Sequence, residues 1–541
     1  MADSWENKLY YGDNLEILRK YIPNESVDLI YLDPPFNSKA DYNVLFKEPT
    51  GQGSTAQIEA FTDSWHWNPA AEKAYDDIIV NAPLKVSKAI EALREFIGSN
   101  DVMAYLAMMT LRLVELHRVL KPTGSLYLHC DPTASHYLKV VLDTIFGPKN
   151  FRNEVIWQRT LAKGLMSRRL PDNHDLILYY GKSGQAVWNS SAMFTKYDVA
   201  DLPEKTTGKY SHRDDDGRLY QLSDITNPNH NRPNLTYEFL GITKVWRWTK
   251  ARMQAAYDAG LIVQPSPGSV PRFKRYLDEQ RGLPLGTVWI DIPPLNSQAK
   301  ERLGYPTQKP EALLERIIRL SSNEGDVVLD PFCGCGTAVI AAQKLNRRWI
   351  GIDITHLAIT VMRKRLQDSF PGIEYEVVGE PKDLEGAKAL ARQDRYQFQW
   401  WALSLVNALP QSGEKKKGAD EGIDGVITFI HDNKGKASRV IIQVKSGSVT
   451  VKDIREMKSV IGSENLGLFI TLQSSTEPMR TEAATAGFYH WPLYKRDYPR
   501  IQILTIEELL SGQKPDLPYS IPGFAKAKKI AKGKQMSLAG E

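Results

Sequence analysis

The segment YLDPPFN, residues 31–37, combines residue types that can act on an amino group. An exocyclic amino nitrogen of a nucleobase is a poor nucleophile, because its lone pair is delocalised into the ring. The Asp33 carboxylate and the Pro34 carbonyl can accept its two N–H groups and draw the nitrogen toward tetrahedral geometry. Pro34 and Pro35 fix the backbone without a competing N–H, and Phe36 can stack on an extruded base. The alternative is a plain Asp-Pro-Pro turn after a strand.

A glycine-rich turn, VVLDPFCGCGTAVIAA at 327–342, predicts a second part of the site. An acid ends a strand, and Gly334 and Gly336 then allow close approach of a ligand before a helix begins. The next strand ends in Asp353, which can bind the hydroxyls of a ribose. The G-x-G-T spacing differs from the G-x-G-x-x-G fingerprint of dinucleotide sites. The pattern therefore predicts a nucleoside-containing ligand of another kind.

The elements around these motifs indicate an α/β fold. An apolar run at 27–33, a helix at 104–120 and a strand at 124–130 predict parallel βαβ units. The same alternation returns with strands at 326–330 and 348–354. We expect both motifs to lie at the ends of strands in one sheet.

The region from about 160 to 300 has weaker periodicity and reads as an insertion. Basic and aromatic residues alternate in it, as in Trp246-Arg247-Trp248 and in the run from Arg272 to Tyr276. This mixture suits phosphate contacts and base reading. A loop-rich surface with solvated arginines explains the composition equally well, so both interpretations stay open.

A linker at 381–390 is expected to precede a separate C-terminal unit. A helix at 398–409 and strands at 422–430, 439–447, 466–472 and 501–506 are predicted there, and a lysine-rich tail follows from 516 to 541. Residues two apart on a strand face the same side, so Gln443 and Lys445 can share a site with Asp424. An acid for Mg²⁺ and a lysine near the attacking water are what metal-dependent nucleases need.

Length, net charge and cysteine content exclude few classes of protein function. The chain has 541 residues and a formal net charge of +5, which is weak evidence for a nucleic-acid partner. Three cysteines are too few for a disulfide framework, and Cys333 and Cys335 lack the second ligand pair of a zinc site. No apolar stretch long enough for a membrane helix and no signal peptide is evident, so we expect a cytoplasmic protein without membrane contact.

Taken together, the motifs resemble those of the beta class of DNA amino-methyltransferases. DPPF at 33–36 is similar to their motif IV, DPFCGCGT at 330–337 to motif I, and YPTQKPEALLERII at 305–318 to motif X. The order, with DPPF first, is the permuted order of that class. The resemblance implies a circularly permuted Rossmann-like methyltransferase over residues 1–380, with a target-recognition insertion at about 160–300. It also implies a prokaryotic, site-specific enzyme that uses S-adenosylmethionine on double-stranded DNA, as part of a restriction-modification system.

The resemblance also assigns residues and a substrate. It places the donor beside Gly12, Asp13, Thr307, Lys309, Pro310, Asp330, Phe332, Gly334, Gly336, Thr337 and Asp353, with catalysis at Asp33, Pro34, Pro35 and Phe36. DPPF is most often associated with adenine N6, and cytosine N4 is the alternative. An RNA substrate stays open, and so does a homodimer. A cytosine-C5 enzyme would need a nucleophilic cysteine in a Pro-Cys context, which the chain lacks.

The C-terminal unit, residues 390–515, resembles the Mrr-like branch of the PD-(D/E)xK nucleases. The resemblance implies a smaller α/β restriction-endonuclease-like domain, with Asp424, Gln443 and Lys445 as its site and Asp424 as a Mg²⁺ ligand. Gln399 stands near where such domains often carry a glutamate, so one ligand is in doubt. Active Mg²⁺-dependent cleavage and a non-cutting module that binds DNA or a partner are both open.

Overall fold

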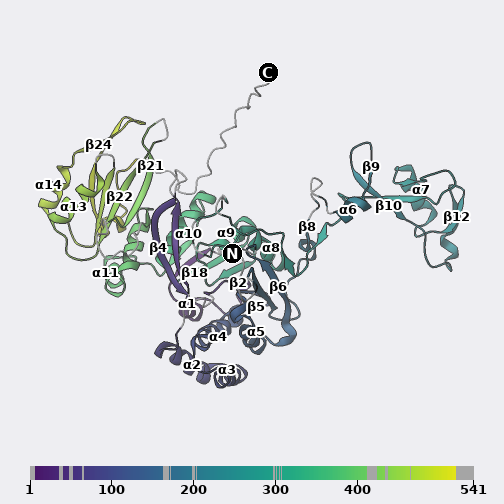
Figure 1. The fold of residues 1–541 in the computed structure, drawn as a ribbon, viewed down its shortest axis with the longest axis horizontal. Helices are drawn as coiled ribbons and strands as arrows, with labels where there is room; N and C mark the ends of the chain where they lie inside the picture. The colour runs from purple at the N-terminus through teal and green to yellow at the C-terminus, as the bar shows by residue number, and fades with distance from the viewer. Residues whose placement is uncertain are drawn as a thin grey trace, which may run out of the picture. The chain divides into compact units, whose positions relative to one another are not determined.

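The computed structural model describes residues 6–35, 40–47, 53–63, 66–161, 170, 172–195, 197, 202, 204–296, 299, 301–303, 305, 307–410, 423–432, 436–462 and 465–518 (Figure 1). The chain divides into two compact units: residues 1–188 together with 287–541, and residues 189–286. The two largest sheets of the larger unit lie on either side of residue 380 in the sequence.

A nine-stranded sheet dominates the larger unit, and its order mixes early and late parts of the chain. Neighbouring strands run parallel, except that β7 is antiparallel to both of its neighbours. The order is β16 (Val288–Trp289), β6 (Phe151–Gln158), β7 (His174–Gly181), β5 (Leu120–Cys130), β2 (Val27–Leu32), β17 (Val327–Asp330), β18 (Arg348–Asp353), β1 (Lys8–Tyr11) and β19 (Glu376–Val378). The predicted fold class, a permuted α/β sheet with a second, smaller α/β domain, is confirmed.

The central strands form because they are largely apolar, and even their aspartates are buried. Every residue of β2 and β17 is buried, as expected for parallel strands covered on both faces. Helix α4 buries twelve of its residues, and ten of them belong to the main core. The helices of this part are α1 (Asn14–Tyr21), α2 (Pro69–Asn81), α3 (Leu84–Ile97), α4 (Asp101–Val119), α5 (Pro132–Phe146), η1 (Pro148–Asn150), α8 (Glu311–Ser321), α9 (Thr337–Lys344) and α10 (His356–Ser369), and β3 (Ala40–Lys47) pairs with β4 (Gly53–Asp63).

The smaller unit, residues 189–286, has its own core around Trp246, which is fully buried. A four-stranded sheet runs in the order β13, β14, β10, β9, and two short hairpin-like pairs accompany it. Its elements are η2 (Ser190–Met193), β8 (Phe194–Thr195), α6 (Glu204–Lys209), β9 (His212–Arg213), β10 (Leu219–Asp224), η3 (Pro233–Leu235), β11 (Thr236–Phe239), β12 (Ile242–Val245), α7 (Lys250–Asp258), β13 (Ile262–Val263), β14 (Arg272–Tyr276) and β15 (Leu283–Pro284).

The C-terminal part contains a five-stranded sheet in the order β20, β21, β22, β23, β26. The segment predicted to be a linker is largely helical instead: α11 buries Ala387 and Leu390 in this core. Those two residues are spaced one helical turn apart, a signal that the surrounding charges obscured. The elements are α11 (Leu384–Gln393), α12 (Arg395–Ser404), β20 (Leu409–Pro410), β21 (Gly425–Ile430), β22 (Ala437–Lys445), α13 (Val451–Ile461), β23 (Leu466–Thr471), α14 (Glu477–Ala484), β24 (Phe488–Trp491), β25 (Arg496–Pro499), β26 (Ile501–Thr505) and α15 (Ile506–Leu510).

Candidate active site

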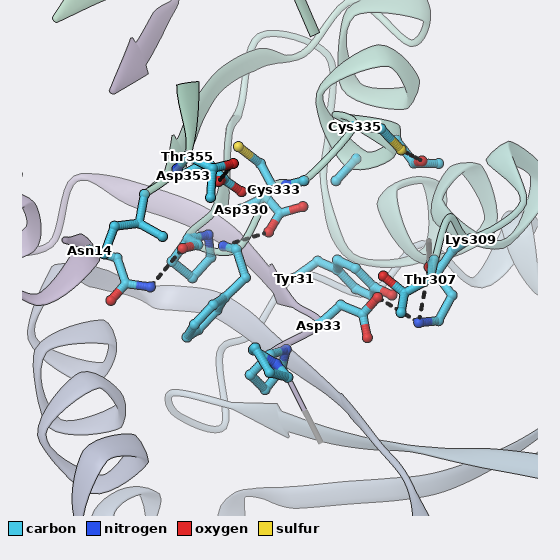
Figure 2. Close-up of a pocket in the computed structure, with 18 of the residues that line it drawn as sticks. Asn14, Tyr31, Asp33, Thr307, Lys309, Asp330, Cys333, Cys335, Asp353 and Thr355 are labelled. Carbon is cyan, nitrogen blue, oxygen red and sulfur yellow. Dashed lines mark hydrogen bonds and ion pairs between the residues drawn. The ribbon is translucent and has the colours of Figure 1, made fainter. Parts of the chain in front are cut away.

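A cavity of about 300 Å³ lies where the central strands of the large sheet end (Figure 2). Asp33 follows β2 and the glycine loop follows β17, and these two strands are parallel neighbours. Ligands of open α/β sheets bind at the carboxyl ends of the strands. The structure brings the following predicted residues to the cavity wall: Gly12, Asp13, Asp33, Pro34, Pro35, Thr307, Lys309, Asp330, Phe332, Gly334, Thr337 and Asp353. Phe36 lies outside the described residues.

The glycine loop needs its glycines for both conformation and space. Gly334 and Gly336 have φ values of 49° and 77°, which side chains rarely adopt. A Cβ on Gly336 would come within 2.6 Å of Met362 Cγ, and one on Gly334 within 3.2 Å of the Tyr305 ring. Backbone and neighbouring side chains therefore leave the loop no room for a larger residue, and the loop can approach a ligand closely.

Asp353, at the end of β18, organises the loop from the opposite side. Its Oδ2 accepts a hydrogen bond from Gly334 N at 2.9 Å, and its Oδ1 accepts from Thr355 N and Oγ1 at 2.9 Å each. Burial raises the pKa of this carboxyl despite those donors. A carboxylate has further lone pairs, so Asp353 can hold the loop and still accept a hydroxyl.

Asp13 is held by a buried arginine that the sequence prediction missed. Asp13 caps α1 by accepting from Leu15 N at 2.8 Å, and its Oδ2 pairs with Arg112 Nη2 at 2.7 Å. Asn14 donates to the Pro331 carbonyl at 2.8 Å and so ties this segment to the glycine loop. The available signal was Arg112 in the largely apolar stretch of α4 from Val102 to Val114, because arginine is rarely buried without a partner.

Lys309 contacts Asp33 directly. Its Nζ lies 2.6 Å from Asp33 Oδ2, and the two side chains are only 9% and 15% exposed (Figure 2). The Thr307 carbonyl lies 3.5 Å from the same nitrogen. The resemblance placed Lys309 beside the donor, and a pair with the catalytic candidate was not expected. This pair orients one oxygen of Asp33, whose carboxylate can accept further N–H donors.

Tyr31, two residues before Asp33, begins a buried chain of polar side chains. Its Oη lies 2.9 Å from His129 Nδ1, and His129 Nε2 lies 3.0 Å from Asp175 Oδ2. None of the three is more than 2% exposed, and Arg159 Nε lies 3.3 Å from Asp175 Oδ1. Burial opposes charge on Asp175, yet the His129 hydrogen bond and nearby cations lower its pKa. In the tautomer with hydrogen on Nε2, His129 donates to Asp175 and accepts a hydrogen bond from the Tyr31 hydroxyl at Nδ1.

The candidate nuclease residues do come together, but the aspartate is already satisfied by protein donors. Gln399 Nε2 donates to Asp424 Oδ1 at 2.8 Å, and Val444 N donates to Oδ2 at 2.6 Å. A glutamate at position 399 would instead repel Asp424 and require a cation between them. Gln443 and Lys445 share one face of β22, as predicted. Among the residues that the structure describes, no cluster of three or more His, Cys, Asp or Glu could hold a metal ion.

Helix α12 also reaches the wall of the cavity. His356 N donates to Gln397 Oε1 at 2.9 Å. Trp400 packs on a buried cluster that includes Tyr305 and Cys335, which both line the cavity. The C-terminal part is therefore in direct contact with the walls of the candidate site.

In the smaller unit, part of the basic and aromatic pattern has a structural role. Trp246 is fully buried in the core, and Lys274 pairs with Asp214 at 2.9 Å. Arg247 Nε donates to the Thr226 carbonyl at 2.8 Å. These contacts give the three residues a structural role within the unit.

Comparison with known proteins identifies the family of the part of the chain that forms the nine-stranded sheet. The family profile described as DNA methylase, for N6 and N4 methyltransferases, matches residues 27–364. The chain belongs to this family. The DNA adenine methyltransferase YhdJ of Escherichia coli K12 is 48% identical over 366 residues, covering 66% of this chain and 82% of that protein. The type II methyltransferase M.EcaI of Enterobacter cloacae is 28% identical over 364 residues, covering 66% of this chain and 69% of the relative.

A second profile covers the C-terminal part of this methylase. Residues 407–511 match a family described as NACHT-associated inactive restriction endonuclease 1, which supports a fused endonuclease-like domain. The expected Mg²⁺ at Asp424 is not supported, and the Gln399 amide on that carboxylate is the physical reason. Among solved structures, the cytosine-N4-specific PvuII DNA methyltransferase is 15% identical, with a TM-score of 0.32, over 68% of this chain and 88% of that one. Within the described residues, no helix is long and apolar enough to cross a membrane.

Proposed function

We propose that this methylase transfers a methyl group from S-adenosylmethionine to adenine N6 in a specific double-stranded DNA sequence, as a permuted, beta-class enzyme. The observation that carries the proposal is the shared cavity of Asp33 and the glycine loop, at the ends of two neighbouring parallel strands. The 48% identity to an adenine methyltransferase favours N6 over N4. Cytosine N4 remains the alternative acceptor.

The residues at the cavity fit the methyl donor. Asp353 offers a partly buried carboxylate for the ribose hydroxyls, and a side chain at Gly334 would crowd the Tyr305 ring. Asp13 and Thr307 both line the cavity, for the adenine and methionine parts. When bound, the donor supplies a methyl group that is already activated by a sulfonium, so the transfer needs no metal.

The chain itself prepares the acceptor. The base must leave the duplex stack to reach a cavity of this kind. The Asp33 carboxylate and the Pro34 carbonyl then accept the two N–H groups and localise the lone pair on nitrogen. Lys309 holds Asp33 in the orientation for this task. Positioned acceptors of this kind act without reorganising during the reaction.

The insertion and the C-terminal part have functions other than methyl transfer in this proposal. We assign residues 1–380 to the methyltransferase, with target recognition in the insertion at about 160–300, which contains the compact unit 189–286. Residues 390–515 form the endonuclease-like domain, for which we propose DNA binding or partner docking without cleavage. The Gln399–Asp424 hydrogen bond favours this second role.

The test is incubation of plasmid DNA with the protein and labelled S-adenosylmethionine, with and without Mg²⁺, followed by nucleoside mass spectrometry and a gel. We expect N6-methyladenine in intact plasmid, and none with Asp33→Ala. Asp28→Asn is the matched control, because Asp28 pairs with Lys121 at the other end of β2, away from the cavity. Methylated cytosine would move the acceptor to N4, and label in RNA alone would refute the DNA assignment. Fragments that appear only with Mg²⁺ would refute the non-cutting role.

A further inference from the structure

The chain Tyr31–His129–Asp175 is costly for a protein to bury. An imidazole and a carboxylate lose several kcal/mol of hydration between them, and each needs well-placed partners. These residues come from β2, β5 and β7, so the chain runs across the sheet toward the cavity. Tyr31 lines the cavity and lies beside Asp33 on the same face of the strand end (Figure 2). Donor binding and acceptor orientation, as described above, do not use this chain.

Methylation of an amino nitrogen releases a proton. The nitrogen lone pair forms the new N–CH₃ bond, and the electron pair of the broken C–S bond stays on the leaving sulfur. The nitrogen is then cationic and must lose one of its protons to become the neutral methylamine. A side chain that lines the cavity can accept that proton directly from the nitrogen.

Asp33 is a poor final holder of the proton because of Lys309. Protonation of Asp33 would remove the negative charge that lies 2.6 Å from Lys309 Nζ, and so would weaken this largely buried ion pair. The neighbouring chain has the opposite property, because Asp175 already provides a negative charge for a protonated His129.

We propose that Tyr31, His129 and Asp175 form a proton relay that receives the proton released by methyl transfer. The N–H proton passes to Tyr31 Oη while the hydroxyl proton of Tyr31 moves to His129 Nδ1. The result is a neutral methylamine, a neutral Tyr31 and an imidazolium paired with Asp175, so that charge and protons balance. This inference rests on the proposed amino-methyl transfer. The charged groups that act on the chain are Asp33, Asp330, Lys309 and Arg159.

The chain offers a matched control for a purely structural role. Tyr127 is 1% exposed on the same face of the sheet, and its hydroxyl lies 2.6 Å from Ser321 Oγ. It does not line the cavity. Tyr31→Phe and Tyr127→Phe therefore each remove one buried, hydrogen-bonded hydroxyl, and only the first interrupts the relay. His129→Gln is a second test variant, because the glutamine amide can donate to Asp175 from the position of Nε2 but cannot carry the extra proton.

The experiment measures single-turnover methylation across pH, donor affinity and thermal midpoints for the full chain. We expect Tyr31→Phe and His129→Gln to slow transfer by about 10²-fold, the lower range for general acid–base groups, with donor affinity unchanged. Because the relay carries a proton, the wild-type rate should depend on pH, and both variants should lose that dependence. Independently of activity, ¹⁵N NMR of the free protein should show His129 as the Nε2–H tautomer, with a change at Nδ1 in Tyr31→Phe.

Several outcomes would overturn the relay. The relay is refuted if Tyr31→Phe transfers methyl groups at the wild-type rate and with the wild-type pH dependence. It is also refuted if Tyr127→Phe slows transfer as much as Tyr31→Phe does and both variants lose thermal midpoint to the same extent. An Nδ1–H tautomer of His129 would also contradict it. If the wild-type protein methylates DNA in the same assay, these results refute the relay alone. If it methylates nothing, the proposed function fails and the relay fails with it.

Discussion

Removal of Asp33 should cost stability as well as activity, and the two losses should be separable. At 2.6 Å and an effective dielectric constant of about 20, the attraction between Asp33 and Lys309 amounts to about 6 kcal/mol. Desolvation offsets part of this, so Asp33→Ala should lower the free energy of unfolding by about 3–5 kcal/mol. The double variant Asp33→Ala/Lys309→Met leaves no unpaired charge and should regain most of that loss. Methyl transfer should be absent in both.

Urea unfolding, followed by circular dichroism and tryptophan fluorescence, measures these differences. A chain with several compact parts need not unfold in one step, so the midpoint of each transition is compared separately. Lys309→Met alone completes the double-mutant cycle and gives the coupling between the two side chains. If Asp33→Ala and the double variant unfold at the same urea concentration, the ion pair carries no stability and the reasoning is wrong. Methylation by Asp33→Ala would refute its catalytic assignment.

Two further changes test the electrostatics and the domain contact. Burial raises the pKa of Asp330 well above its usual value, so the folded state binds this proton more tightly than the unfolded state. Stability should therefore fall as pH rises above the ordinary aspartate range. In differential scanning fluorimetry, Asp330→Asn should unfold at a higher temperature than wild type near neutral pH, and this difference in unfolding temperature should shrink in acid. A difference that does not change with pH would contradict this reasoning. Trp400→Ala removes the α12 side chain that packs on the hydrophobic cluster around Tyr305, and it should weaken donor binding several-fold as measured by isothermal titration calorimetry. Tyr396→Ala, on the exposed side of α12, should leave donor affinity unchanged. Equal donor affinities in the two variants would show that the Trp400 contact does not support the cavity.

The local motifs and main strands of the methylase could be predicted because their signals are contiguous in the sequence. β2 and β17 are short, largely apolar runs, and an aspartate follows the first and ends the second. The turn after β17 has positive φ values at two positions, and those positions require glycine. Strand patterning, turn chemistry and helix spacing are all local properties. The prediction of a linker at 381–390 was wrong, because a short helix with only two buried residues and many charges resembles a connecting segment until its partner core is known.

The sequence by itself therefore determined which short segments carry chemistry and that they lie at the ends of strands. Only the tertiary structure decided which of their side chains meet. Lys309 and Asp33 are separated by 276 positions in the chain, and no local pattern encodes their 2.6 Å contact. The same holds for the Tyr31–His129–Asp175 chain and for the Gln399 amide that satisfies Asp424. Sheet order and register set these contacts, because parallel pairing brings distant strand ends to one edge, where burial forces each polar group to find a partner.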